Sequence, residues 1–327
     1  MYPIKSFLEI AKLARKQVHR NLTIFPLLAP DGIEPEYLTL EQALDKDLIQ
    51  ITELNTQGSV PELRLQNLGK KSVMIIEGEE LVGAKQNRIV NSSFLISGKT
   101  EVVLPVSCVE QGRWSYRSEA FESGKKMMPA SLRREHQKDV KFSLKRGRGY
   151  QSDQSRIWDN ISEKSARMNV ESPTHAMADV YESYEGKLSE FINKFQLIEW
   201  QVGAVFAMDG KILGLEGFGC HDTFKRFFDK LVKSYALDAL DSRDASQKES
   251  VPPNKARRFI ESTLKSKGEN HPSIGLGTNI TFEFRTVSGA ALVNDDQVLH
   301  LSAFKKEKGD NASGVGYQRF SQRRRRR

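Results

Sequence analysis

The side chains best suited to chemistry gather between residues 77 and 88. Residues 77–80 read Glu-Gly-Glu-Glu and directly follow the apolar run 73–76, and residues 85–88 read Lys-Gln-Asn-Arg. Carboxylates can bind a divalent metal, act as general acids or bases, or accept hydrogen bonds from ribose hydroxyls. A lysine and an arginine suit a phosphate, and the two amide side chains can read an amide or a base. The alternative interpretation is a solvated turn held by local ion pairs.

A second such segment, residues 105–114, reads Pro-Val-Ser-Cys-Val-Glu-Gln-Gly-Arg-Trp. Its glutamate could act as an acid or base, its arginine could hold a phosphate, and its tryptophan could stack on a base or sugar. Cys108 stands among valines, which favours a buried, inert thiol over a nucleophile. The candidate catalytic residues are Glu77, Glu79, Glu80 and Glu110, and the candidate ligand-binding residues are Lys85, Gln86, Asn87, Arg88, Arg113 and Trp114. A divalent metal is a candidate cofactor, although no spacing defines its ligands.

Strands and turns must position both segments. Alternating or apolar runs predict strands over residues 48–54, 60–65, 73–76, 88–96 and 101–109. Because these runs leave no room for helices between them, we expect antiparallel pairing, with a turn at residues 97–99. Thr39 and Gln42 have the spacing of a capping box, which predicts a short helix.

Further along the chain the pattern becomes largely helical. Residues 176–195 favour helix, Asp209-Gly210 between apolar runs predicts a β-hairpin, and Asp222 can cap a helix that ends near Leu240. A helix near residues 255–264 and strand-like runs over 280–287 and 291–301 follow. The predicted fold class is α+β. It has a mainly antiparallel N-terminal β unit, a helix-rich unit with a β-hairpin, and a small C-terminal helix–hairpin extension.

These patterns divide the chain into five parts. They are an N-terminal helix over 1–20 with apolar residues at helical spacing, a main domain over 21–240, a polar linker over 241–256, the extension over 257–304, and a disordered basic tail over 305–327.

The net charge of +8 comes from two basic segments. Residues 125–148 carry nine lysines and arginines against two acids, and Arg323–Arg327 add five positive charges. Without these +7 and +5 segments the rest of the chain has a charge of −4. We interpret residues 125–148 as a mobile charged loop, or alternatively as a lid that guides anions to the two polar segments. The arginine tail could make weak, non-specific contacts with nucleic acid.

Several classes of protein are excluded or disfavoured. No apolar run approaches the roughly 18 residues of a membrane-spanning helix, so no membrane association is expected. Two cysteines exclude a disulfide scaffold and a four-cysteine zinc site. They fit a reducing compartment, and with no signal-peptide pattern after Met1 we expect a cytoplasmic protein. The oligomeric state is left open.

Two strings, EGEELVGAKQNR (77–88) and LPVSCVEQGRW (104–114), resemble a domain family known mostly from bacteria. It is the ARG (ADP-ribosylglycohydrolase) and Rhodanese-Phosphatase-superfamily-associated Protein domain family. Further segments within residues 20–240 are similar to it in kind, such as QVGAVFAMDG from Gln201. By association, the resemblance implies a role in processing ADP-ribose or an NAD-derived metabolite. Lys85, Arg88 and Arg113 would then suit the pyrophosphate, the four glutamates the riboses, and Trp114 the adenine.

Three hypotheses follow. The first is a pocket that binds a nucleotide-like anion, plausibly ADP-ribose, with hydrolysis or transfer at a ribosyl or phosphoryl centre if the protein is an enzyme. The second is a non-enzymatic binding or adaptor module in a bacterial stress or defence system. The third is a nucleic-acid-associated protein that uses the basic segment and the arginine tail. Whether the protein is an enzyme at all is left open.

Overall fold

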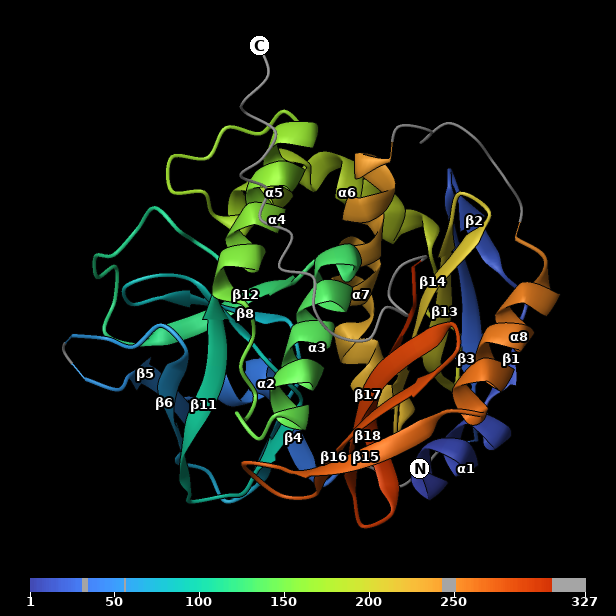
Figure 1. The fold of residues 1–327 in the computed structure, drawn as a ribbon, viewed down its shortest axis with the longest axis horizontal. Coiled ribbons are helices and arrows are strands. Elements are labelled where there is room, and N and C mark those ends of the chain that lie inside the picture. Colours follow the sequence, from blue (N-terminus) through green and yellow to red (C-terminus); the bar gives the residue numbers. More distant parts are fainter. Residues whose placement is uncertain (31–34, 56, 243–250, 308–327) are drawn as a thin grey trace.

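The computed structural model describes residues 1–30, 35–55, 57–242 and 251–307 and has the predicted α+β fold. Figure 1 shows two β units with helices between them. The helices are α1 (Tyr2–Ile10), α2 (Leu40–Leu44), α3 (Ala130–Lys145), α4 (Gln154–Arg167), α5 (Met177–Ser183), α6 (Glu185–Lys194), α7 (His221–Asp241) and α8 (Pro253–Leu264).

The larger β unit is one antiparallel sheet in the order β1-β3-β13-β14-β18-β17-β16-β15, with β2 also paired to β3. It joins strands from both ends of the chain. The strands are β1 (Lys12–Leu13), β2 (Gln17–His19), β3 (Leu22–Leu28), β13 (Gln201–Met208), β14 (Lys211–Phe218), β15 (Lys267–Pro272), β16 (Thr278–Phe284), β17 (Val287–Asn294) and β18 (Gln297–Lys305).

The smaller β unit holds both polar segments. A six-stranded sheet has the order β12-β8-β9-β11-β6-β5, and a three-stranded sheet has the order β10-β7-β4 with β4 and β7 parallel. The strands are β4 (Tyr37–Thr39), β5 (Ile49–Glu53), β6 (Glu62–Asn67), β7 (Ser72–Ile75), β8 (Glu79–Gly83), β9 (Arg88–Val90), β10 (Phe94–Ile96), β11 (Glu101–Cys108) and β12 (Phe121–Met127).

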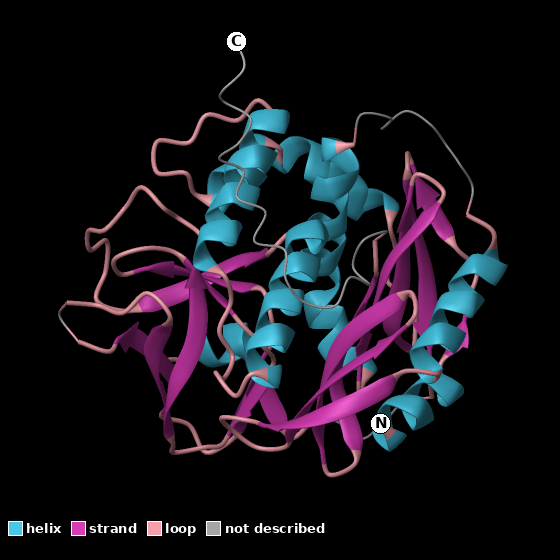
Figure 2. Cartoon of the chain, viewed as in Figure 1, coloured by secondary structure: helices cyan, strands magenta, loops and turns pink. Residues whose placement is uncertain are grey.

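Both faces of the nine-stranded sheet are buried because side chains alternate between them. Ile24, Ala204 and Phe206 face the core that contains α7, whereas Phe25 and Val205 face the core that contains α1 and α8. Figure 2 shows α1 and α8 on the outer side of this sheet and the other long helices between the β units. The apolar stripe of α7 thus lies at the centre of the molecule.

Much of the predicted local structure is confirmed. The five N-terminal strand runs form β5, β6, β7, β9 with β10, and β11, and Thr39 and Gln42 form the expected capping box. Asp209 and Gly210 have φ of 48° and 73° and join β13 to β14, as an Asp-Gly hairpin requires. The helix expected to end near Leu240 is α7, although its N-cap is Cys220 rather than Asp222.

The predicted N-terminal helix over residues 1–20 is wrong beyond Ile10. At Ala11 the backbone becomes extended, and residues 12–13 and 17–19 form β1 and β2. Both strands pair with β3, which supplies the backbone hydrogen bonds that a longer helix would have made internally.

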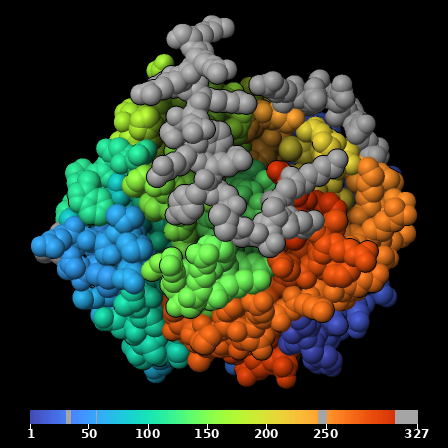
Figure 3. All heavy atoms as spheres, in the orientation of Figure 1, coloured from blue at the N-terminus to red at the C-terminus, as the bar shows by residue number. Residues whose placement is uncertain are grey.

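The basic segment 125–148 is not a mobile loop or a lid. It contains the end of β12 and the whole of α3, and several of its basic side chains pair with acids from distant elements. Arg133 contacts Glu216 at 2.8 Å, and Lys141 contacts Glu283 at 2.5 Å. Figure 3 shows the end of this segment (green) on the surface beside the strands of residues 267–305 (orange to red).

The predicted extension over 257–304 is not a helix and a hairpin attached to the main domain. It contains α8 and four strands, and pairing of β18 with β14 continues the sheet that β3 and β13 begin. The turn at Asp295 and Asp296, where φ is 48° and 57°, divides the predicted strand over residues 291–301 between β17 and β18. Of the linker and the tail, residues 243–250 and 308–327 lie outside the described residues. In the part that is described, no helix is long and apolar enough to span a membrane.

Candidate functional site

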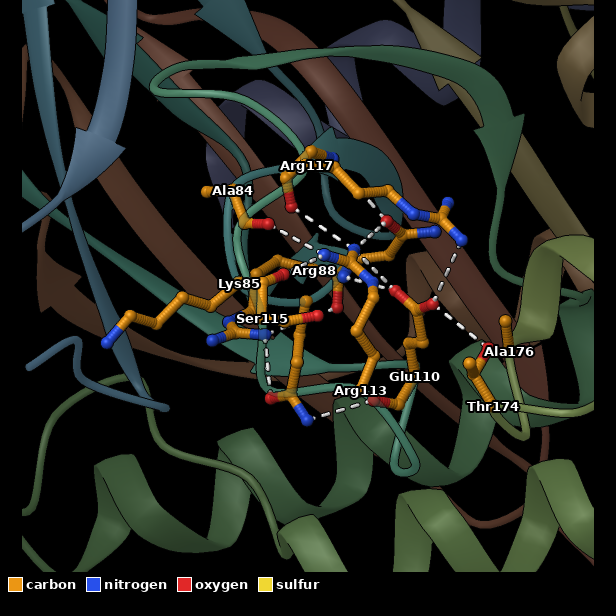
Figure 4. A network of polar contacts seen from close by, with 12 residues as sticks. Ala84, Lys85, Arg88, Glu110, Arg113, Ser115, Arg117, Thr174 and Ala176 are labelled. Carbon is orange, nitrogen blue, oxygen red and sulfur yellow. Dashed lines mark hydrogen bonds and ion pairs between the residues drawn. The ribbon is translucent and has the colours of Figure 1, made fainter.

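The carboxylate of Glu110, just after β11, is the centre of a buried polar network (Figure 4). Its Oε2 accepts hydrogen bonds from Arg113 Nη2 at 2.6 Å and from the Asn87 backbone N–H at 3.0 Å, and its Oε1 accepts one from Thr174 Oγ1 at 3.0 Å. Burial opposes ionisation of this group, but these hydrogen bonds and the Arg113 charge lower the pKa of Glu110 below its ordinary value. Glu110 is therefore an ionised acceptor at neutral pH.

Arg113 clamps the loop that joins β8 to β9. Its Nη1 donates to the carbonyls of Ala84 at 2.6 Å and Ser115 at 2.8 Å. Its Nη2 donates to the carbonyl of Gly83 at 3.3 Å and to Asn87 Oδ1 at 3.1 Å, as well as to Glu110. A phosphate would have to displace these acceptors, so the arrangement suits a positioning role for Arg113.

The amide side chains of Gln86 and Asn87 also make hydrogen bonds within the protein. Gln86 Nε2 donates to the Glu110 carbonyl at 2.9 Å, and its Oε1 accepts hydrogen bonds from Arg88 Nη1 and the Cys108 thiol, each at 3.1 Å. Cys108 is fully buried, and burial raises the pKa of its thiol, although Arg88 opposes the shift. The expectation of a buried cysteine is thus confirmed.

Four side chains lie together beside this network, and we call them the aromatic–basic face: the half-exposed rings of Trp114 and Tyr116 and the buried cations Lys85 and Arg88. Lys85 Nζ lies 5.2 Å from the Trp114 ring and 5.1 Å from the Tyr116 ring, which are 48% and 51% exposed. Arg88 is buried beneath, with its Cζ 5.8 Å from the Trp114 ring. Among the described residues, Arg88 Nε and Nη2 have no hydrogen-bond acceptor, and Glu53 Oε1 lies 3.9 Å from Nη2.

Glu77 and Glu79 do not join Glu110. Glu77 accepts hydrogen bonds from Gln137 Nε2 at 3.0 and 3.2 Å and from Ser302 Oγ at 2.5 Å, between α3 and β18. Glu79 accepts one from the Ile76 backbone N–H at 3.0 Å and pairs with Lys230 at 3.2 Å. These two carboxylates tie the β8 region to α3, β18 and α7, so the four predicted catalytic glutamates do not share one pocket.

Glu80 differs from the other three glutamates. It is 1% exposed, and neither of its oxygens has a hydrogen-bond partner among the described residues. Burial raises its pKa to about 8; Lys126 opposes the shift, and the negative charge of Glu110 adds to it. Glu80 is thus a neutral acid at pH 7, whereas Glu110 is ionised. Opposite shifts of this kind are found in the acid–base pairs of enzymes.

Two features were missed by sequence reasoning. Tyr116 completes the aromatic–basic face, and its position two residues after Trp114 was a usable signal. The other is a buried network in which Arg133 contacts Glu216, and His300 lies 2.8 Å from Ser93 Oγ and 3.6 Å from Glu216. Burial opposes ionisation of Glu216, yet Arg133 keeps its pKa below the ordinary value. No local pattern joins these residues, because they come from α3, β14, β18 and the segment between β9 and β10.

The described residues contain no group of three or more His, Cys, Asp or Glu side chains placed to hold a metal ion. The candidate divalent metal therefore has no ligand set in this part of the chain.

Comparison with known proteins places the geometry in a family. Residues 11–304 match the model of the ARG and Rhodanese-Phosphatase-superfamily-associated Protein domain. The match covers the residues of the predicted extension, in agreement with the continuous nine-stranded sheet. No curated protein and no solved structure matches the chain.

Proposed function

Because the chain belongs to the ARG and Rhodanese-Phosphatase-superfamily-associated Protein domain family, we propose that it binds a nucleotide-like anion of the ADP-ribose class. The site is the aromatic–basic face. The family name associates the domain with ADP-ribosylglycohydrolase, whose ligand class combines a pyrophosphate, two riboses and an adenine.

The observation that supports this function most directly is the pair of half-exposed aromatic rings above two cationic side chains. Trp114 offers a face on which a base can stack, and Lys85 Nζ lies beside that ring. Arg117, 58% exposed and 3.9 Å from Glu110, adds a third cation at the rim. Arg88 has two nitrogens without acceptors among the described residues, and such a guanidinium suits an anionic oxygen, which could reach it only if the ring of Trp114 above it moved.

The ionised Glu110 would support binding by keeping Arg113 and the β8–β9 loop in place. Glu80, with its raised pKa, would be the proton donor for any chemistry at the bound anion only if binding brought the ligand to it. Both carboxyl groups are buried, so catalysis would require that ligand binding open a path to them. Glu77 and Glu79 have no part in this proposal.

Calorimetric titration of the full chain with ADP-ribose, NAD and ADP tests the proposal. Trp114→Ala should weaken binding by roughly fivefold or more, because stacking of a base on an aromatic ring contributes about 1–3 kcal/mol. Trp200→Ala is the matched control, since Trp200 is 50% exposed and is not part of the face. Absence of binding by the wild type, or equal binding by the wild type and Trp114→Ala, would refute the proposal.

An adaptor role is the second candidate, and the residue types of the same face favour it. Exposed Trp, Tyr and Arg side chains are the ones most often found at the energetic centre of protein interfaces. Recovery of a protein partner that depends on Trp114, without nucleotide binding, would support this role. The nucleic-acid alternative is weakened because residues 125–148 are not a mobile loop and several of their cations pair with acids. Deletion of residues 323–327 tests whether the arginine tail binds nucleic acid.

A further inference from the structure

A cavity of about 290 Å³ lies away from the aromatic–basic face and shares no residue with it. It is formed by the start of α3, the end of α7, the β13–β14 hairpin and the end of β18. Met208, Leu213 and Phe304 give it an apolar wall. Its volume is near the lower end of the range typical of small-molecule sites.

The acidic groups of the cavity are already neutralised. Asp238 accepts hydrogen bonds from the Ser131 backbone N–H at 2.7 Å, from Ser131 Oγ at 2.6 Å and from Lys164 Nζ at 2.7 Å. Asp241 pairs with Lys164 at 3.0 Å and with Arg167 at 2.8 Å. Because the oxygens of both carboxylates have donors from the chain, they offer little to a cationic ligand.

The cation at the rim is held by a replaceable partner. The side chain of Arg134 is 21% exposed, and its Nη1 donates a hydrogen bond to the carboxylate of Glu307 at 2.5 Å. Its Nη2 lies 2.9 Å from the carboxylate of Glu135. Glu307 follows the end of β18, and its side chain is 66% exposed. Because the carboxylate at the outer end of this pair is largely exposed, another carboxylate could take the place of Glu307 on Arg134 while Glu307 returns to water.

We propose that this cavity binds a small organic carboxylate with an apolar body. The body would lie against Met208, Leu213 and Phe304, and the carboxylate would replace that of Glu307 on Arg134. Since one carboxylate is exchanged for another, the ion pair is conserved and burial of the apolar body drives binding. Glu307 then acts as an internal competitor for the site.

Three probes with the same eight-carbon body and different head groups test the sign of the charge. Calorimetric titration of the full chain with octanoate should give binding at least tenfold tighter than with 1-octanol, because a charge-assisted hydrogen bond is lost in the alcohol. Octylamine should bind most weakly. Binding of octylamine as tight as that of octanoate would overturn the proposal.

Variants identify the site. Glu307→Gln should tighten octanoate binding severalfold because the competitor is removed, whereas non-specific binding to an apolar surface would not change. Arg134→Gln should abolish the advantage of octanoate over octanol. Leu213→Trp should fill the cavity and remove binding, with the fold checked by circular dichroism. Unchanged octanoate binding in any of these three variants would refute the proposal. Trp114→Ala should leave octanoate binding unchanged, which separates this test from that of the proposed function.

Discussion

Replacement of Glu80 by glutamine should stabilise the protein at neutral and alkaline pH. In the folded chain Glu80 is buried without a hydrogen-bond partner among the described residues, and its pKa rises from 4.5 to about 8. Below pH 4.5 the group is protonated in both the folded and the unfolded chain, so its titration does not change the free energy of unfolding there. Above that pH it ionises only in the unfolded chain, so the free energy of unfolding falls as the pH rises.

The magnitude follows from the two pKa values. Each pKa unit corresponds to about 1.4 kcal/mol, so the loss between pH 4.5 and pH 8 is on the order of 5 kcal/mol. Above pH 8 the folded group ionises as well, and the loss levels off. Glutamine has a similar shape but no charge. The free energy of unfolding of Glu80→Gln minus that of the wild type should therefore increase with pH by several kcal/mol across this window.

Urea denaturation at pH 5, 6, 7 and 8 measures this difference, and titrations of all other groups largely cancel in it. Glu79→Gln is the control from the neighbouring position. Glu79 accepts a hydrogen bond from the Ile76 backbone N–H and pairs with Lys230, so its replacement should destabilise the protein at pH 8, where Glu80→Gln stabilises it. A difference between Glu80→Gln and the wild type that is the same at pH 5 and pH 8 would show that Glu80 is not held protonated.

Two further outcomes are expected. Arg113→Lys keeps the charge but loses the planar fork that holds Glu110 and three backbone carbonyls, so we expect a loss on the order of 2–4 kcal/mol in urea denaturation, and a loss below about 1 kcal/mol would contradict the clamp. Cys108 and Cys220 are both buried, and burial raises the pKa of the Cys108 thiol. Neither should react with Ellman's reagent at pH 7.5 until urea is added, and rapid reaction of the native protein would contradict this burial.

Local patterns predicted the elements that local forces determine. Strand alternation, the Thr39 capping box and the Asp209-Gly210 turn depend on residues close in sequence, and the structure confirms them. The prediction for the basic segment 125–148 was wrong because the acidic partners of its side chains are remote in sequence. Lys141 pairs with Glu283, 142 residues away, and without that partner the segment looks too charged to pack.

Only those contacts of the site that form between residues close in sequence were predicted. Glu110 and Arg113 are three residues apart, and the structure does join them. Glu79 and Glu80 are neighbours in β8, and successive side chains of a strand point to opposite faces, so the acidic run could not converge on one pocket. Glu79 and Glu80 lie on opposite faces of β8. The ion pair of Glu79 with Lys230 depends on α7, which lies far along the chain, so the sequence of β8 alone does not show which glutamate is paired.

The pairing of β3 with β13 and of β14 with β18 has a consequence for synthesis of the chain. Residues 22–28 cannot pair with residues 201–208 until the latter have been synthesised, and the same holds for residues 211–218 and their partners 297–305. At roughly 5–20 residues per second, β3 leaves the ribosome on the order of ten seconds or more before its partner. During that interval β1 and β2 can pair with β3, but the edge of β3 that will bind β13 has no partner strand, which exposes it to aggregation. The nine-stranded sheet can therefore be completed only after residues 297–305 have been made.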